Sequence, residues 1–368
     1  MILYTVVGFL FVLTIVIFFH ELGHFLVARW CGVAVKTFSI GFGREIAGFT
    51  DRYRTRWRLS WIPLGGYVKF IDDENAASAG HKSLEQLSPE DRARSFQSKP
   101  LAARAAVVAA GPIANFILAI VIFTAIFTLF GERITAAKVD IVNPGSAAER
   151  AGFQPGDTVI SIDGKAIDSF SEMQRIVSTS PDQPLHFVVG RGGQTVDITA
   201  TPERKEITDH FGNTIRLGLL GIQRSASADD WTLRRHDPAT AFVMALNEVK
   251  FVIERTFGYL YDVIVGRESA DQLGGPIRIA ELSGQVASLG TGPLLNFIAY
   301  ISVSIGLLNL FPIPMLDGGH LLFYGIEAIR GRPLSESTQE IGFRIGLAFV
   351  LMLMIFATWN DLIHLKFL

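Results

Sequence analysis

Residues 1–24 read MILYTVVGFLFVLTIVIFFHELGH, an uncharged apolar run that ends in three ionisable side chains. An apolar run of about 20 residues is long enough to cross a bilayer as a helix. On a helix, His20 and His24 lie on one face, so both imidazoles can bind one zinc ion. Glu21 stands beside them as a candidate general base. The stretch therefore predicts a transmembrane helix that carries a metal site at its end.

Three further windows also lack Asp, Glu, Lys and Arg: residues 105–131, 282–316 and 345–360. The chain has 368 residues and is 18% charged, against about 25% in ordinary globular proteins. The four windows predict four membrane spans and exclude a wholly soluble protein. The net charge of −2 gives no attraction to nucleic acid, and the single cysteine, Cys31, excludes an intramolecular disulfide framework.

The loop between the first two spans is rich in cations. Residues 28–104 contain 13 Lys and Arg against 8 Asp and Glu, whereas residues 131–292 contain 16 against 21. Because cytoplasmic loops carry an excess of Lys and Arg, we expect the first loop to be cytoplasmic. Both termini and residues 131–292 then lie on the other side of the membrane.

Residues 52–61 alternate between cationic and apolar side chains, which predicts a strand with one wet and one apolar face. Tyr67–Phe70 extends the same sheet. Two interpretations remain open: an amphipathic hairpin on the cytoplasmic leaflet, or an edge to which a substrate segment adds as a further strand. The candidate substrate-binding side chains are Arg52, Arg54, Arg56 and Trp57. We expect residues 72–100 to form a loop.

Residues 134–222 have the pattern of a small soluble α/β module. Turn signals separate predicted strands at Val139–Val142, Val159–Ile162, Leu185–Val189 and Thr195–Ala200 and predicted helices at Ser146–Ala151 and Ser171–Val177. Residues 239–264 show the apolar spacing of an amphipathic helix.

The third apolar window ends in NLFPIPMLDGGH at residues 309–320, where two prolines and two glycines interrupt the helix. Broken backbone at membrane depth is tolerated where it is buried in protein or lines a wet cavity. Asp317 lies in this break and is the best candidate for a third metal ligand, with His320 as its competitor. Asn309 suits a hydrogen bond to substrate or to a tetrahedral intermediate, or else to a neighbouring helix.

Three motifs in this order, HELGH at 20–24, GPIANF at 111–116 and the 309–320 stretch, resemble the site-2 protease family of intramembrane metalloproteases, especially the bacterial regulator-of-sigma-E proteases. The resemblance implies zinc held by His20, His24 and Asp317, with Glu21 activating water. It also implies a PDZ domain at 134–222, whose peptide-binding loop at 217–222 contains Gly218, Leu219 and Gly221. Many family members have a second asparagine where this chain has Ser304, so Ser304 is a candidate substitute.

The predicted fold is an α-helical polytopic membrane protein with four transmembrane helices, a membrane-associated β-hairpin and one inserted PDZ (α/β) domain. The expected segments are a first transmembrane helix (1–30), a cytoplasmic loop with the hairpin (31–104), a second transmembrane helix (105–131), the PDZ domain (132–225), an external amphipathic helical segment (226–290), a third transmembrane segment (291–320), a cytoplasmic connection (321–343) and a fourth transmembrane helix with a tail (344–368).

The resemblance further implies an intramembrane endopeptidase of the bacterial inner membrane, with the PDZ domain and both termini in the periplasm. The expected partners are a single-span membrane substrate, such as an anti-sigma factor or a remnant signal peptide, a site-1 protease that cuts the same substrate first, and the lipid bilayer; no nucleic acid is expected. Two alternatives stay open: a non-catalytic PDZ receptor or scaffold with a structural metal, and a zinc hydrolase of lipids or small molecules.

Overall fold

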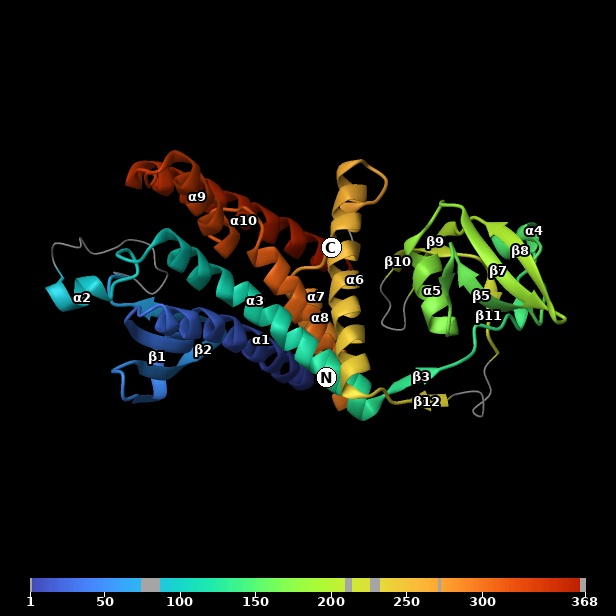
Figure 1. The fold of residues 1–368 in the computed structure, drawn as a ribbon, viewed down its shortest axis with the longest axis horizontal. Coiled ribbons are helices and arrows are strands. Elements are labelled where there is room, and N and C mark those ends of the chain that lie inside the picture. The colour runs from blue at the N-terminus through green and yellow to red at the C-terminus, as the bar shows by residue number, and fades with distance from the viewer. Residues whose placement is uncertain (1, 74–86, 209–213, 226–231, 271–272, 365–368) are drawn as a thin grey trace. The chain divides into compact units, whose positions relative to one another are not determined.

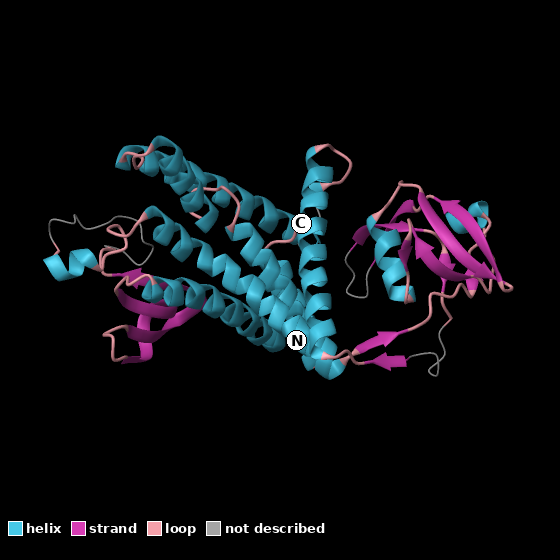
Figure 2. Ribbon diagram, viewed as in Figure 1, coloured by secondary structure: helices cyan, strands magenta, loops and turns pink. Residues whose placement is uncertain are grey.

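The structure is a computed structural model that describes residues 2–73, 87–208, 214–225, 232–270 and 273–364. The chain divides into two compact units, a mainly helical one made of Met1–Ile126 and Pro238–Leu368 and a mainly β one made of Phe127–Asp237 (Figures 1 and 2). The predicted domain boundaries within these units stay predictions.

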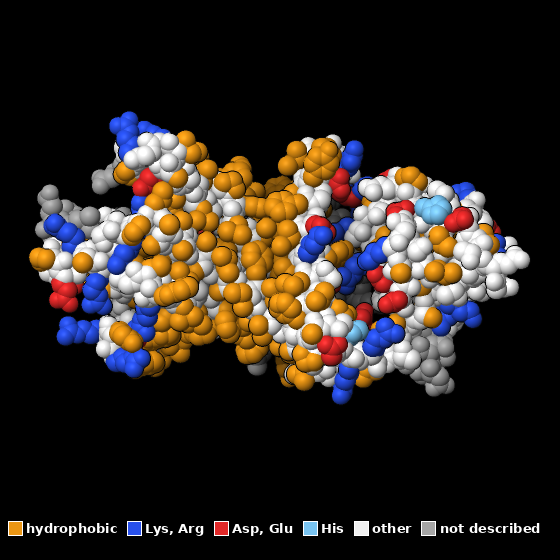
Figure 3. Space-filling model, in the orientation of Figure 1, with side chains coloured by type: hydrophobic (Ala, Val, Ile, Leu, Met, Phe, Trp, Pro, Cys, Tyr) orange, Lys and Arg blue, Asp and Glu red, His pale blue; other side chains and the backbone are white. Residues whose placement is uncertain are grey.

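The helical unit is built from long apolar helices. Its helices are α1 (Ile2–Trp30), α2 (Pro89–Ala93), α3 (Leu101–Ala125), α6 (Pro238–Ile264), α7 (Pro276–Ser288), α8 (Thr291–Asn309), α9 (Asp317–Arg330) and α10 (Glu336–His364). Four of these are long and apolar enough to cross a membrane, with spans at Tyr4–Trp30, Leu101–Phe130, Thr291–Asn309 and Ser337–Ile363. Hydrophobic side chains cover the visible flank of this unit, as expected of a surface that faces lipid (Figure 3). Among the described residues, these four candidate spans agree with the four predicted ones in number and order.

The first helix extends further than its uncharged window indicates. The window ends at His20, but α1 runs on to Trp30, so the HELGH motif lies inside the helix rather than at its end. At the motif, Gly23 meets α3 so closely that a Cβ atom would overlap the Ala110 carbonyl oxygen. Small residues allow such close approach of membrane helices. The motif therefore lies at the contact between α1 and α3.

A buried carboxylate, that of Asp361, follows the uncharged window of the last span and binds the start of α7. Asp361 is almost fully buried and accepts hydrogen bonds from the backbone N–H groups of Gly275 (2.8 Å), Ile277 (3.0 Å) and Arg278 (3.1 Å). These N–H groups belong to the N-terminus of α7, where the helix dipole favours a negative charge. The acid at the end of α10 thus caps α7.

The two strands of the helical unit fold back on each other twice. β1 (Val35–Thr50) and β2 (Arg56–Phe70) pair along two stretches of β1: residues 56–59 pair with residues 37–40 on one side and with residues 47–50 on the other. Residues 66–70 pair with the first part of β1, and they form the outer strand among the described strand pairs of this sheet. The result is a small curled sheet with residues 45–50 at one edge and residues 66–70 at the other. The prediction that Tyr67–Phe70 belongs to this sheet is confirmed.

The strand prediction at residues 52–61 is partly wrong. The structure has a turn at Arg52–Arg54, and β2 begins only at Arg56. The reason is local: the Asp51 carboxylate accepts the backbone N–H groups of Tyr53 (2.9 Å) and Thr55 (3.0 Å), and Arg54 adopts a left-handed φ of 66°. Side-chain bonds of this kind compete with strand pairing.

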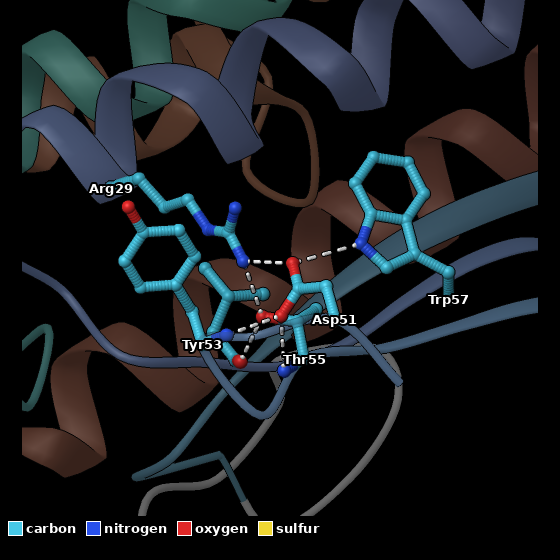
Figure 4. A network of polar contacts seen from close by, with 6 residues as sticks. Arg29, Asp51, Tyr53, Thr55 and Trp57 are labelled. Atoms are coloured by element: carbon cyan, nitrogen blue, oxygen red, sulfur yellow. Dashed lines mark hydrogen bonds and ion pairs between the residues drawn. The ribbon is translucent and has the colours of Figure 1, made fainter. Parts of the chain in front are cut away.

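Asp51 also ties the turn to the end of α1 (Figure 4). Its carboxylate forms an ion pair with Arg29 of α1 and accepts the indole N–H of Trp57 at 3.2 Å. The Trp57 ring lies against Phe25 and Phe38, with ring centroids 4.8 and 4.4 Å away. This network fixes the sheet against the first helix, one turn beyond His24.

The loop prediction at residues 72–100 can be compared only in part. Residues 74–86 lie outside the described residues, and Pro89–Ala93 form the short helix α2, capped by the Ser88 hydroxyl. Asp72 fixes the segment that precedes α3. Its buried carboxylate accepts the backbone N–H groups of Phe96 and Gln97, both at 3.1 Å.

The β unit contains a four-stranded antiparallel sheet in the order β6-β5-β7-β8. Its strands and helices are β3 (Glu132–Ile134), β4 (Ile141–Val142), α4 (Ala147–Ala151), β5 (Thr158–Ile162), β6 (Lys165–Ala166), α5 (Phe170–Thr179), β7 (Leu185–Arg191), β8 (Gln194–Ala200), β9 (Glu203–Thr208), β10 (Thr214–Leu219), β11 (Ile222–Gln223) and β12 (Thr232–Arg234). The predicted helices and strands of this region are confirmed within a few residues. Its core includes Val139, Phe153, Ile162, Phe187 and Val189.

One buried carboxylate anchors this core. Asp157 is fully buried and accepts two hydrogen bonds of 2.7 Å from the Arg191 guanidinium and one of 2.9 Å from the backbone N–H of Gln154. Burial alone would raise the pKa of Asp157, but the bonds from Arg191 and Gln154 outweigh it and hold this pKa below its usual range. The stabilisation is therefore present above the pKa of the unfolded carboxyl and is lost as the pH falls through the lower folded pKa.

We predict that Asp157→Asn destabilises the β unit by about 1.5–3 kcal/mol at neutral pH, the usual value of hydrogen bonds to a charged group. Hydrogen exchange of β5 and β7 in the full-length protein, corrected for intrinsic rates, measures this loss. Wild-type protection should fall on acidification below about pH 4, and the variant should lack that component. Asp197→Asn, at an exposed position on β8, is the matched control and should leave protection unchanged. Equal protection in wild type and Asp157→Asn would contradict the assignment.

Candidate metal centre

Two helices bring together two imidazoles and one carboxylate. His20 and His24 come from α1, and Asp317 is the first residue of α9. The Nε2 atoms of the two histidines are 3.2 Å apart, and Oδ2 of Asp317 lies 3.1 Å from Nε2 of His20 and 3.5 Å from Nε2 of His24. All three side chains are mostly buried, with 11–18% of their surface exposed.

The donor atoms fit a zinc ion. Ligands bound about 2.0–2.2 Å from a tetrahedral zinc lie about 3.3–3.6 Å from one another, close to the distances observed here. Oδ2 of Asp317 is buried without a hydrogen-bond donor of suitable geometry, and two imidazole nitrogens point at each other across the same space. A shared cation satisfies all three atoms. Three protein ligands leave a fourth position open, as in catalytic rather than structural zinc sites.

The break before α9 places Asp317. Residues 310–316 fold back over the first turn of this helix so closely that a Cβ atom on Gly318 would overlap the carbonyl oxygens of Leu310 and Phe311. Gly319 meets Ile313 in the same way, and Met315 adopts a left-handed φ of 90°. The break packs irregular backbone against the buried Gly318 and Gly319 and directs the carboxylate from a helix N-terminus, where a negative charge is favoured.

Glu21 lies on α1 between the two histidines, and its carboxylate faces strand β2. Its carboxylate accepts a hydrogen bond from the Val68 backbone N–H of β2 and lies near enough to His20, His24 and Asp317 to interact with their charges. Gly66 of the same strand approaches Glu21 so closely that an added Cβ would lie 3.0 Å from its Cγ. The candidate base is therefore positioned by the edge of the sheet.

The third helix supplies the surface behind both imidazoles. Nδ1 of His24 donates to the Val107 carbonyl oxygen at 2.9 Å, and Nδ1 of His20 lies 3.2 Å from Nδ2 of Asn115. Between these two contacts, Gly111 leaves the space that the rings occupy, because a Cβ there would overlap the His24 ring. Residues 107, 111 and 115 follow one another at intervals of four and so share one face of α3.

The other candidates from the membrane-embedded motifs lie outside this cluster. The His320 ring packs against Phe343 of α10, with ring centroids 5.2 Å apart, and is not among the three residues that converge. The Ser304 hydroxyl donates to the Tyr300 carbonyl oxygen of its own helix at 3.0 Å. Asn309 ends α8 at the start of the break and is half-buried. Roles for Asn309 and Ser304 stay predictions.

Two of the candidate substrate-binding side chains on the β1–β2 sheet contact other parts of that sheet. Trp57 is part of the Asp51 network, and Arg56 forms an ion pair with Glu45. Arg52 and Arg54 lie in the turn before β2. The main chain of residues 56–59 is paired on both sides, so this segment has no free edge for a substrate strand. Strand addition is therefore ruled out for residues 56–59, whereas a substrate-binding role for the side chains of Arg52, Arg54, Arg56 and Trp57 stays a prediction.

Gly218 and Leu219 end β10, and Gly221 follows in the turn to β11. A Cβ on Gly218 would overlap the Val177 carbonyl oxygen at the end of α5, and Gly221 adopts a φ of 82° beside Ser146. Both glycines are thus required by close packing. A peptide-binding role for this loop stays a prediction.

Sequence reasoning assigned no role to Gly111, Asn115 or the Val68 amide. A signal existed for Asn115: it is the one amide side chain in the uncharged window 105–131. Polar groups inside membrane spans usually have a partner and a function. No comparable signal marks a backbone group such as the Val68 N–H.

Comparison with known proteins agrees with this geometry. The family model described as peptidase family M50 matches residues 8–353. A protein of Rhizobium meliloti named "Putative zinc metalloprotease" is 49% identical, covering 98% of this chain and 96% of its own length. A protein of Agrobacterium fabrum with the same description is also 49% identical, covering 97% and 95%. The metalloprotease MmpA of Caulobacter vibrioides is 41% identical, covering 97% and 94%.

These matches span nearly the whole chain and include every residue of the metal cluster. Together with the four membrane-spanning helices, they identify a multi-pass membrane protein and a zinc-dependent metalloendopeptidase. The chain belongs to peptidase family M50, the site-2 protease family.

Proposed function

We propose that this enzyme cuts a transmembrane segment of a single-span membrane protein inside the bilayer, with zinc held by His20, His24 and Asp317. The observation that carries the proposal is the convergence of these three side chains on helices that are long enough to span a membrane, or directly follow one. Buried ionisable groups at such depth are costly, and a metal with a catalytic role explains their retention.

The residues divide the chemistry between them. Zinc, when bound, acts as a Lewis acid toward water and the scissile carbonyl. Glu21 accepts the proton of the attacking water and passes it to the leaving amide nitrogen. The Val68 N–H holds the Glu21 carboxylate in place, and the apolar helices around it exclude bulk water. The role assigned to Asn309, at the end of α8, is to donate a hydrogen bond to the oxygen of the tetrahedral intermediate.

A helical substrate hides its backbone in internal hydrogen bonds, so it must unwind before attack. The edge formed by residues 66–70 is where the unwound segment docks, because the described strand pairs make this end of β2 the outer strand of the sheet. The same edge lies beside Glu21 through the Val68 N–H. A strand added there brings its own peptide bonds next to the base.

The distribution of Lys and Arg supports the proposed orientation of the protein in the membrane. Lys and Arg side chains gather at the end of the helical unit that carries β1, β2, α2 and the end of α9 (Figure 3). Anionic lipids and the positive-inside rule place such an end in the cytoplasm. The termini and the β unit then lie in the periplasm of a bacterial inner membrane.

The β unit is proposed to be a PDZ domain that restricts access by size. Its four-stranded sheet, the helix α5 beside β10 and the glycine-rich turn at Gly221 support this assignment. Such a filter admits substrates only after a site-1 protease has removed their external domain. An anti-sigma factor or a remnant signal peptide fits this requirement.

Two alternatives are less well supported. A non-catalytic receptor with a structural metal needs no general base, yet Glu21 lies beside the metal ligands. A hydrolase of lipids or small molecules needs no strand edge at the base, yet residues 66–70 provide one.

We predict that Glu21→Gln keeps about one zinc per chain but cleaves a single-span model substrate about 10²–10⁴-fold more slowly, the range lost with a general base. Asp317→Ala should lose zinc, whereas His320→Ala, three residues away, should keep it. Metal analysis of the purified proteins, beside cleavage with and without a chelator, measures both effects. Wild-type turnover by Glu21→Gln would refute the mechanism, and zinc loss only in His320→Ala would reassign the ligand.

We predict that substrate docks as a strand on the 66–70 edge. In a Cys31→Ser, Glu21→Gln background, Tyr67→Cys should form disulfides with substrate cysteines at every second position, because cross-strand side chains alternate between faces. Phe49→Cys on the opposite edge is the matched control and should crosslink weakly. Equal crosslinking from Phe49→Cys, or a period of three to four along the substrate, would contradict strand addition.

We predict that replacing residues 134–222 with a short flexible linker relaxes substrate choice. The deletion should cleave a substrate with an intact external domain as fast as one already trimmed, whereas wild type should prefer the trimmed form. Zinc content confirms that the helical unit remains folded. A zinc-loaded deletion that cleaves neither substrate would show that the β unit is needed for catalysis and does not act as a filter.

A further inference from the structure

Asn115 has a fully buried side-chain amide that lies next to the metal ligand His20. Asn115 lies on α3 with none of its surface exposed, and its Nδ2 is 3.2 Å from Nδ1 of His20. The other end of the same amide, Oδ1, is buried without a hydrogen-bond partner. The Asn115 backbone carbonyl accepts the Ser302 hydroxyl of α8 at 2.8 Å, so the residue is held between two helices.

The tautomer of His20 decides which end of this amide faces the ring. Nε2 of His20 points toward His24 and Asp317, so metal binding requires a lone pair on Nε2. In a neutral imidazole the proton then resides on Nδ1, which becomes a donor. An NH₂ group opposite Nδ1–H places two donors face to face. A half-turn of the amide about its last torsion removes this conflict, because it brings the unpartnered oxygen to the ring.

The second histidine shows the same arrangement with a backbone acceptor. Nδ1 of His24 donates to the Val107 carbonyl oxygen, which leaves its Nε2 free for the metal. Val107 and Asn115 lie on one face of α3, eight residues apart, as His20 and His24 lie on one face of α1. α3 thus places a backbone carbonyl against His24 and the Asn115 amide against His20.

We propose that Asn115 is a positioning residue for His20: its amide oxygen accepts the Nδ1–H and fixes the ring with Nε2 unprotonated toward the metal. This inference rests on the proposed metal site. Partners of this kind set the tautomer, the orientation and the basicity of metal-binding histidines, and their loss usually weakens metal binding about 10–100-fold. Asn115 touches neither the metal nor the substrate in this role.

Zinc affinity, measured by competition with a chromophoric chelator on the full-length protein in detergent, tests the proposal. Asn115→Leu keeps the shape of the side chain without an acceptor and should weaken zinc binding about 10–100-fold. Asn115→Asp keeps an acceptor, cannot donate once ionised, and should bind zinc at least as tightly as wild type. Ser302→Ala is the matched control: it removes the hydrogen bond to the Asn115 backbone and leaves the amide in place, so zinc affinity should not change.

Wild-type affinity in Asn115→Leu, or equal weakening in Asn115→Asp and Asn115→Leu, would overturn the proposal. A weakened Ser302→Ala would show that helix packing, and not the amide, controls affinity. The proposed metal site is tested separately by His20→Ala: unchanged zinc affinity there would refute the site itself, whereas a loss there with normal Asn115→Leu would refute only the positioning role.

A spectroscopic measurement on the unaltered chain covers the case in which a variant does not fold. In zinc-loaded protein labelled with ¹⁵N-histidine, two imidazole Nδ1–H protons should be protected from exchange, one bonded to Val107 and one to Asn115. Only one protected ring proton in wild type would overturn the proposal.

Discussion

The burial of three ionisable side chains among apolar helices is the constraint on which the rest of the helical unit depends. Each charged group at mid-bilayer costs about 2.5–3.5 kcal/mol on insertion scales. His20, His24 and Asp317 reduce that cost by converging on one point, where a single cation can bind all three side chains. The convergence requires α9 to begin at a defined place, and so it requires the folded-back break that precedes Asp317.

Different elements orient the metal ligands and the base. α3 stands behind the two imidazoles, with the Val107 carbonyl and Asn115 at their Nδ1 atoms. β2 stands behind Glu21 through the Val68 N–H. The ligand geometry is therefore set within the helix bundle, whereas the base is set by a sheet that is itself fixed to the end of α1 through Asp51 and Arg29. Metal binding and proton transfer have separate supports.

The sequence was informative where the signal is local. Missing charge located the four spans, helical spacing paired His20 with His24, and the proline–glycine break indicated Asp317. It failed where partners are distant: alternation at residues 52–61 gives two faces of a strand but cannot show that β1 lies on both sides of it. The Asp51 turn overrode that alternation through side-chain hydrogen bonds, and Asn115 acquires a partner only when α3 lies beside α1.

The contact between Gly23 and the Ala110 carbonyl has a consequence for how this site can vary. Each imidazole of α1 has its hydrogen-bond acceptor on α3. The distance between the axes of α1 and α3 therefore decides whether the two histidines reach these acceptors. Gly23, inside the HELGH motif, sets this distance together with Ala114 and Gly111 on α3. A larger side chain there would leave all three ligands in the sequence but withdraw two of them from their supports. The motif thus encodes helix spacing as well as metal chemistry.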